Sequence, residues 1–331
     1  MSVQSNLDRF QSKKWGIFHH FLGGNNAYEW NCIVNRVNVN RWAEQLAELG
    51  CGFMGITLMQ LRHTMLAPNA TYDRITGYKP GEACAQRDFV MDLSDALRKY
   101  DIDLMLYFTG DGPSHDVSRR ACDAFGFSSQ KWVEETKKWE YDHDLGFYTE
   151  EYVDKWVSVM EEYALRYGDR VFAWWLDGCY EHLYETPEIR DKYLAKFKAA
   201  ARAGNPDALI TFNAGYSFSW QKRGKPFSST SVEDFTPGEE DSMFELPESR
   251  YVDGKQWFAF YCNGFWVDRE KMKKGDHMDL VPTAKYTPDE IYDHVKKVNE
   301  KGGIVMFDTT FFDYEVIDPR QFHAMSKLKN L

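Results

Sequence analysis

The sequence predicts a (β/α)8 barrel, and three observations carry that prediction. Eight short runs rich in apolar, β-branched and aromatic residues recur along the chain, and most are followed by a segment with helical periodicity. Strands that alternate with helices in this order form a parallel sheet with right-handed crossovers. The length of 331 residues also fits, because eight such units need about 250 residues, often with insertions. We therefore expect one barrel domain over residues 1–331.

The order of the elements follows from these patterns. Strands are expected at 14–21, 52–58, 103–108, 171–177, 208–213, 229–234, 256–262 and 303–308. Helices are expected at 40–49, 88–100, 150–167, 187–204, 287–301 and 322–328, three of them opened by the capping residues Thr149, Thr186 and Thr287. Long insertions at 59–87 and 109–147 read as loops. No clear helix appears between 214 and 250, so we expect a distorted or incomplete barrel around strands five and six.

The stretch from Val171 to Gly178 organises the rest of the chain. Six apolar residues run directly into Asp177 and Gly178, which is typical of a strand buried on both faces. In parallel barrels the active site lies at the carboxyl ends of the strands, so Asp177 is a candidate catalytic carboxylate. The alternative is that Asp177 caps the next helix or solvates the strand end.

Composition excludes several classes of function. The net charge of −11, with no basic block, argues against nucleic acid or an anionic membrane as the main partner. No apolar run approaches the roughly 18 residues of a membrane helix. The first residues lack a signal-peptide pattern, so we expect a cytoplasmic protein, or a periplasmic or secreted one whose leader was removed.

Metal and disulfide chemistry are not expected either. The six cysteines are scattered singly, which supports neither a zinc site nor a disulfide framework. The nine histidines include one adjacent pair but no His-x-His and no His-Glu-x-x-His. We expect no catalytic metal and no cofactor, and the patterns leave the oligomeric state open.

Residues that directly follow the predicted strands are mostly acidic or aromatic. They are His19, His20, Gln60, Arg62, His63, Asp111, Asp177, Asn213, Glu233, Asp234, Glu239, Glu240, Asn263, Trp266 and Asp308. Two carboxylates on either side of a bond are the arrangement used in glycoside hydrolysis. Trp30, Trp174, Trp175 and Trp266 would suit the C–H faces of sugars, although each could equally belong to the core.

Several motifs, in order along the chain, resemble the α-L-fucosidase family of glycoside hydrolases. They are Lys14-Trp-Gly-Ile-Phe-His-His20, Ala27-Tyr-Glu-Trp30, Arg87-Asp88, Ala173-Trp-Trp-Leu-Asp-Gly178, Glu233-Asp-Phe-Thr-Pro-Gly-Glu239 and Lys301-Gly-Gly303. The resemblance implies a retaining exo-glycosidase with Asp177 as nucleophile and Glu239 as acid/base. Glu233 and Glu240 are the alternatives for the acid/base. The candidates for sugar contacts are His20, Glu29, Trp30, Gln60, His63, Trp175, Asn213 and Trp266.

The chain also departs from that family. The family's second strand runs into Lys-His-His-Asp-Gly-Phe, which grips the sugar, whereas Leu58-Met-Gln-Leu-Arg-His63 stands here. Asn213 stands where an arginine is expected, and we expect no counterpart of the family's C-terminal β-sandwich. These differences favour retained chemistry on a glycone or linkage other than the family's own.

Two rival hypotheses remain open. A carbohydrate-binding barrel that has lost turnover would keep the fold and lack hydrolysis. A metal-dependent barrel hydrolase would need clustered histidine and aspartate ligands at the strand ends, and the sequence does not offer them.

Overall fold

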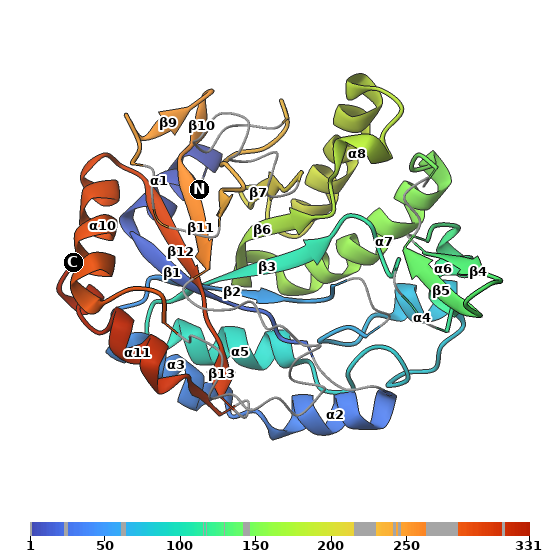
Figure 1. The fold of residues 1–331 in the computed structure, drawn as a ribbon, viewed down its shortest axis with the longest axis horizontal. Helices are drawn as coiled ribbons and strands as arrows, with labels where there is room; N and C mark the ends of the chain where they lie inside the picture. Colours follow the sequence, from blue (N-terminus) through green and yellow to red (C-terminus); the bar gives the residue numbers. More distant parts are fainter. Residues whose placement is uncertain are drawn as a thin grey trace.

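A computed structural model confirms the predicted (β/α)8 barrel. It describes residues 2–22, 26–60, 64–114, 116, 118–128, 130–141, 146–214, 230–240, 243, 246–262, 284–312 and 315–331. Eight parallel strands form one curled sheet in the order β7-β6-β3-β2-β1-β12-β11-β8 (Figure 1). Their bounds are β1 Trp15–His19, β2 Phe53–Thr57, β3 Asp103–Thr109, β6 Val171–Asp177, β7 Leu209–Phe212, β8 Glu239–Glu240, β11 Phe258–Cys262 and β12 Ile304–Asp308.

Helices pack around this sheet (Figure 1). They are α1 Val3–Ser12, α2 Ala27–Arg36, α3 Val39–Glu48, α4 Ala70–Thr76, α5 Phe89–Arg98, α6 Arg120–Phe125, α7 Glu150–Tyr167, α8 Pro187–Ala201, α10 Pro288–Glu300 and α11 Pro319–Met325. The three capping residues expected from the sequence, Thr149, Thr186 and Thr287, each accept a backbone N–H bond at the start of their helix. Among the described helices, none is long and apolar enough to cross a membrane.

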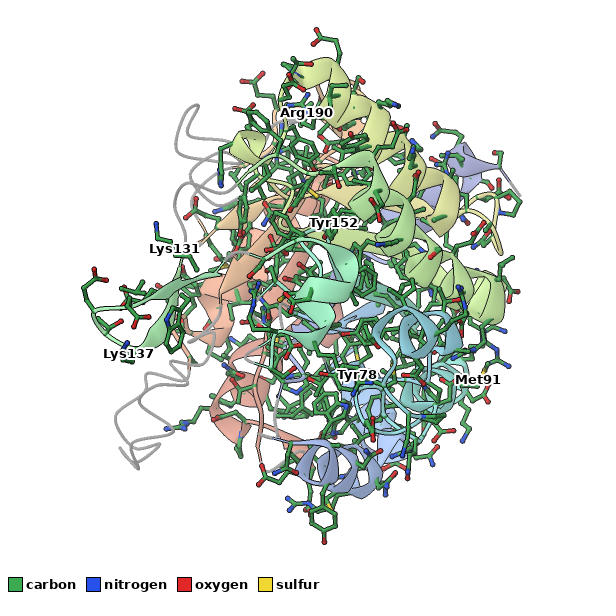
Figure 2. All side chains as sticks on the ribbon, turned by 90° about the vertical axis from the view of Figure 1, so that its right-hand side faces the viewer. Tyr78, Met91, Lys131, Lys137, Tyr152 and Arg190 are labelled. Atoms are coloured by element: carbon green, nitrogen blue, oxygen red, sulfur yellow. The ribbon has the colours of Figure 1, made fainter. Side chains whose placement is uncertain are left out.

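The two insertions expected as loops contain short elements. The first holds α4, and the second holds α6 and a hairpin of β4 (Gln130–Val133) and β5 (Lys138–Tyr141). Figure 2 shows this hairpin, which carries Lys131 and Lys137, projecting from the body of the molecule. Helices of six or seven residues are too short to show a clear 3.6-residue period, which explains why the sequence pattern did not predict them.

The sixth strand differs from the prediction. Residues 230–234 are not a strand, and the sixth strand of the sheet in chain order is the two-residue β8. The segment before β8 lies between β7 and β11, because the backbone N–H of Asp234 donates to Ile210 O at 2.8 Å and its carbonyl accepts from Gln256 N at 3.2 Å. The Asp234 carboxylate also accepts the backbone N–H of Ile210 at 3.0 Å. That side chain takes a donor that a neighbouring strand would otherwise use, so regular pairing does not form.

Side-chain alternation along β6 places Asp177 inside the barrel. Ala173 and Trp175 belong to the cluster within the barrel, whereas Trp174 and Leu176 pack in the layer between sheet and helices. Because successive strand residues point to opposite faces, Asp177 shares the inward face with Trp175. At the amino end of the strands, the ring of Phe10 from α1 fills the barrel and contacts the rings of Phe53, Phe172, Phe235 and Phe258.

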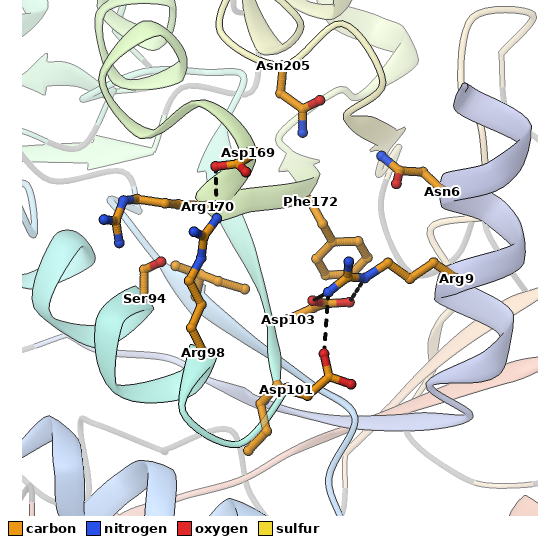
Figure 3. A pocket seen from close by; sticks show the side chains of 12 residues that line it. Asn6, Arg9, Ser94, Arg98, Asp101, Asp103, Asp169, Arg170, Phe172 and Asn205 are labelled. Carbon is orange, nitrogen blue, oxygen red and sulfur yellow. Dashed lines mark hydrogen bonds and ion pairs between the residues drawn. The ribbon is translucent and has the colours of Figure 1, made fainter. Parts of the chain in front are cut away.

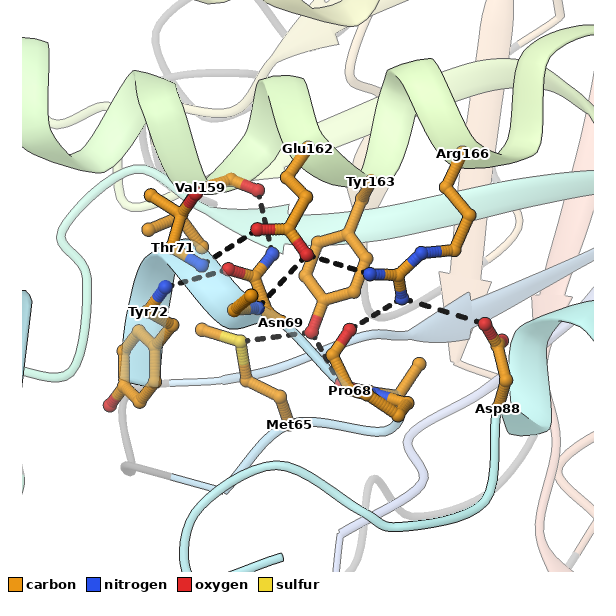
Figure 4. Close-up of polar contacts among 12 residues, drawn as sticks. Met65, Pro68, Asn69, Thr71, Tyr72, Asp88, Val159, Glu162, Tyr163 and Arg166 are labelled. Carbon is orange, nitrogen blue, oxygen red and sulfur yellow. Dashed lines mark hydrogen bonds and ion pairs between the residues drawn. The ribbon is translucent and has the colours of Figure 1, made fainter. Parts of the chain in front are cut away.

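The insertion after β2 is held against α7 (Figure 4). The Glu162 carboxylate accepts the backbone N–H groups of Ala70 and Thr71 at 2.9 and 2.7 Å. The buried Asn69 side chain donates to Val159 O, and the Tyr163 hydroxyl donates to Ala67 O at 2.6 Å. Helix α7 therefore holds residues 67–71 of this insertion in place.

Candidate active site

The carboxylate of Asp177 is held by two neutral donors. The Tyr107 hydroxyl donates to its Oδ2 at 2.7 Å, and the Asn213 amide donates to its Oδ1 at 2.9 Å. Tyr107 lies in β3 and Asn213 directly follows β7, and these two strands are the neighbours of β6 in the sheet. Helix α8 is capped by Thr186, so the alternative in which Asp177 caps the next helix is wrong.

Glu239 and Asp177 are joined through the side chain of Asn213. The same Asn213 nitrogen donates to Glu239 Oε2 at 2.6 Å. Because one atom lies within these distances of both oxygens, Asp177 Oδ1 and Glu239 Oε2 are separated by no more than the sum of the two, 5.5 Å. Retaining glycosidases hold their two carboxyl groups about 5–5.5 Å apart.

Tyr107 belongs to this group, although sequence reasoning did not single it out. Its ring is buried and stacks on Trp175, with centroids 5.4 Å apart and an interplanar angle of 21°. Burial, followed by the negative charge of Asp177, raises the pKa of the Tyr107 hydroxyl well above its usual value, so it remains a donor. The available signal was its place two residues before the end of a barrel strand, where inward side chains line the mouth.

The two alternative acids occupy other positions. Glu240 is buried, and as the next residue of β8 it points to the face opposite Glu239. Glu233 is buried beside Thr230, whose backbone N–H donates to its carboxylate at 3.5 Å. Of the three glutamates, Glu239 is the one that the contacts of the described residues join to Asp177 through Asn213.

His20 lies on the inner side of the barrel rim. Its Nδ1 is 3.1 Å from Oδ1 of Asp308 at the end of β12, and both side chains are buried. The His20 ring lies 6.1 Å from the Tyr107 ring, whereas His19 faces outward and packs 5.5 Å from Trp42. Of the adjacent pair, His20 is thus the one near the acids, and its contact with a sugar stays a prediction.

The other predicted contact residues are spread more widely. The buried Trp175 donates its indole N–H to Pro237 O at 3.0 Å, so it supports the segment that leads to Glu239. The buried Trp30 packs in the outer cluster and donates its indole N–H to Met65 O at 2.8 Å. Glu29 is half-buried on α2 and Gln60 is half-buried after β2. Sugar binding by these four residues stays a prediction, and His63 and Trp266 lie outside the described residues.

No group of three or more His, Cys, Asp or Glu side chains suited to a metal ion occurs among the residues that the structure describes. The grouping of Asp177, Glu239, Asn213 and Tyr107 supplies two carboxyl groups joined through one amide, with a second neutral donor on Asp177.

Comparisons with known proteins bear on the fold. No family model and no curated protein matches the sequence. Among solved structures, the chain is similar to the endo-fucoidan hydrolase MfFcnA4 of glycoside hydrolase family 107, with a TM-score of 0.70, 14% identity and coverage of 98% of this chain and 53% of that one. It is also similar to an α-L-fucosidase of glycoside hydrolase family 29 from Bacteroides thetaiotaomicron (TM-score 0.61, 15% identity, 98% and 72% covered).

A third similar structure is the α-L-fucosidase AlfC from Lactobacillus casei, with a TM-score of 0.63, 13% identity and coverage of 98% and 97%. The chain therefore spans about half the length of the first of these proteins and nearly all of the third. At such identities the likeness shows a common fold, and the barrel of this chain is the one found in these fucosidases and fucoidan hydrolases.

Proposed function

We propose that this chain is a retaining glycoside hydrolase whose substrate is a glycan containing fucose or a closely related sugar. The observation that carries the proposal is the single Asn213 amide that donates to both Asp177 and Glu239, which limits the separation of the two bonded oxygens to 5.5 Å. The motifs that resemble α-L-fucosidases, and the structural likeness to enzymes named for fucose and fucoidan, support the choice of sugar.

The proposed mechanism has two displacements. Asp177 attacks the anomeric carbon while Glu239 gives its proton to the leaving oxygen, so that a glycosyl–Asp177 ester forms and the aglycone departs as an alcohol. Glu239 then takes a proton from a water molecule, which attacks the same carbon and releases Asp177 as a carboxylate. Two inversions give net retention at the anomeric carbon.

The donors around Asp177 have a clear task in this scheme. A nucleophile must be ionised and aimed, and the bonds from Tyr107 and Asn213 hold one oxygen each. Both donors are neutral, so they orient the carboxylate without the strong Coulomb attraction of a cation, which would lower its nucleophilicity.

The test is a substrate screen followed by trapping. Aryl α-L-fucoside is assayed beside α- and β-galactosides, arabinosides, rhamnosides and fucoidan, and product stereochemistry is read by NMR. Asp177→Asn should reduce turnover by roughly 10³-fold or more, because it removes the covalent route. A fluorinated glycoside should add its mass to the peptide that contains Asp177.

The rival is a barrel that binds carbohydrate without turnover. Absence of hydrolysis by the wild type on every glycoside, together with saturable glycan binding that Asp177→Asn leaves intact, would favour that rival. A label on a different carboxylate would keep the hydrolase and move the nucleophile.

A further inference from the structure

Asp111 is a third carboxyl group beside the proposed nucleophile, and the mechanism above does not use it. It follows β3 by two residues, and the residue is only 5% exposed. The Thr109 hydroxyl donates to its Oδ1, and the Ser114 hydroxyl donates to its Oδ2 at 3.2 Å. Among the described residues it contacts no lysine or arginine, so its negative form would be buried without a compensating cation.

The Asp111 carboxyl packs directly against the residue that follows Asp177. A Cβ placed on Gly178 would lie 2.8 Å from the Asp111 Cγ and closer still to its Oδ1, and Gly178 has a φ of +71°. Only glycine accepts both that conformation and that contact. The backbone N–H of Gly110 also donates to Asp177 O at 2.6 Å. The ends of β3 and β6 are thus locked together, with the Asp111 carboxyl wedged between them.

Aromatic donors from α7 and the residues before it complete the surroundings of Asp111. Tyr148 donates to Gly178 O at 3.0 Å, Tyr152 to Gly110 O at 2.7 Å and Trp156 to Thr109 O at 2.6 Å. These bonds fix the backbone on both sides of the carboxyl group. Asp111 is therefore buried between two strand ends whose carbonyl groups are held by aromatic donors.

Apart from Asp177, the ionisable groups that face Asp111 are a thiol and tyrosine hydroxyls that keep their protons at neutral pH. In the described chain these groups are Asp177, Cys179, Tyr107, Tyr148, Tyr152 and Tyr184. Burial raises the pKa of the Cys179 thiol and of the four tyrosine hydroxyls well above their usual values. For Asp111, burial is the largest cause and the charge of Asp177 adds to it, against the two hydroxyl donors, which raises the pKa of the Asp111 carboxyl to about 7.

We propose that Asp111 is a positioning residue of this site, which holds a proton in the working state and, through Gly178, keeps the Asp177 carboxylate in its reactive orientation. The proposal rests on the function proposed above. Ionisation of Asp111 puts a second negative charge beside Asp177 and against the backbone of Gly178. Activity should therefore fall as the pH rises through the pKa of Asp111.

The experiment compares the wild type with Asp111→Asn, Thr109→Val and Asp103→Asn. Asparagine copies the protonated acid in shape and cannot ionise, and valine removes the hydroxyl that stabilises the Asp111 anion. Asp103→Asn is the matched control, because Asp103 lies at the other end of β3 in an ion pair with Arg9. Two quantities are measured from pH 5 to 8: kcat/KM on the substrate found in the screen, and the melting temperature.

For kcat/KM, the wild type should lose activity with a midpoint near the pKa of Asp111, about 7. Asp111→Asn should keep activity at pH 5 within about tenfold of the wild type and extend it to higher pH. Thr109→Val should move the midpoint upward, and Asp103→Asn should leave it in place. An unchanged midpoint in Asp111→Asn, or a downward shift in Thr109→Val, overturns the proposal.

The melting temperature tests the proton without any substrate. A carboxyl group whose pKa is higher in the folded than in the unfolded chain stabilises the fold at low pH, and this stabilisation is lost as the pH rises through the folded value. Between pH 5 and 8 the wild type should therefore lose roughly 3–6 °C more than Asp111→Asn. Equal losses would sink the proposal even if the enzyme is active.

The two failures can be told apart. If no glycoside is hydrolysed, the proposed function fails, and the melting series alone decides whether Asp111 carries the proton. If Asp111→Asn gives no folded protein, the melting series of Thr109→Val decides it instead. The pH at which the melting temperature falls should move upward in that variant, and a downward move overturns the proposal.

Discussion

Acidic residues at the two ends of strands β3 and β6 have different partners. At the amino ends, Asp103 pairs with Arg9 at 2.8 Å and Asp169 pairs with Arg98 at 2.9 Å. These pairs line a cavity of about 320 Å³, in which Figure 3 shows the carboxylates facing guanidinium groups. At the carboxyl ends, Asp111 and Asp177 receive bonds from hydroxyl and amide donors, and neither contacts a lysine or arginine in the described chain.

Under the proposed function, this difference separates acids that stabilise the fold from acids that serve the reaction. A carboxylate paired with arginine is stable as an anion and unavailable for proton transfer or attack. A carboxylate held by neutral donors keeps its nucleophilicity or its proton at the expense of stability, as expected at a functional site. In the described chain, acids at the amino ends of these strands are thus paired with arginines, whereas Asp111 and Asp177 at the carboxyl ends have neutral partners.

The largest loss of activity that tests this comparison is expected at Asn213. Asn213→Ala removes the donor shared by Asp177 and Glu239 and leaves two carboxyl groups without their common partner. We expect kcat/KM to fall about 100- to 1000-fold, as for the loss of other preorganised donors. Asn205→Ala is the matched control at the amino end, where the side chain bonds Val171 O. A loss below tenfold in Asn213→Ala would mean that the amide only fills space.

The next effect is expected at Tyr107. Tyr107→Phe keeps the ring stacked on Trp175 and removes the hydroxyl that donates to Asp177. A hydrogen bond to a charged group contributes about 1.5–3 kcal/mol, so kcat should fall roughly 10- to 100-fold. The melting temperature checks that the core is intact. An unchanged kcat would show that the hydroxyl does not orient the nucleophile.

The smallest effect on catalysis is expected at the opposite end. Asp103→Asn leaves Arg9 without its bidentate partner and should lower the free energy of unfolding by about 1–3 kcal/mol. The kcat/KM value should stay within about twofold of the wild type. Urea denaturation and steady-state kinetics measure both quantities, and a large drop in kcat/KM would contradict the division between the two ends.

The residues at the ends of β6 and β7 could be predicted from the sequence because the pattern that marks them is local. An unbroken apolar run up to Asp177 marks both the strand and its last residue, and the same reasoning placed Asn213 after the next strand. Tyr107 was missed because its bond to Asp177 depends on the register that pairs Thr109 with Asp177, which no local pattern reveals. Asp111 was visible as a strand-end acid, but its packing on Gly178 arises only when two distant turns meet.

For the sixth strand, by contrast, a local pattern predicted an element that the described residues 230–234 do not form. The segment 229–234 has the β-branched and polar residues of a weak strand, yet the carboxylate of Asp234 bonds the Ile210 amide as well as two cations, Lys198 and Arg202. A side chain that competes for backbone donors changes the local fold without changing residue composition.

The rings of Tyr148, Tyr152 and Trp156 have a wider electrostatic consequence. Carbonyl groups at the carboxyl ends of parallel strands carry partial negative charge toward the site, which would repel every acid gathered there. The hydroxyls of Tyr148 and Tyr152 and the indole N–H of Trp156 donate to Gly178 O, Gly110 O and Thr109 O. These bonds offset part of the carbonyl charge at the two strands that lead to Asp111 and Asp177. A homologous barrel that kept the acids and lost these three donors would have to protonate or disperse its carboxylates, so α7 and the residues just before it limit which chemistry the rim can hold.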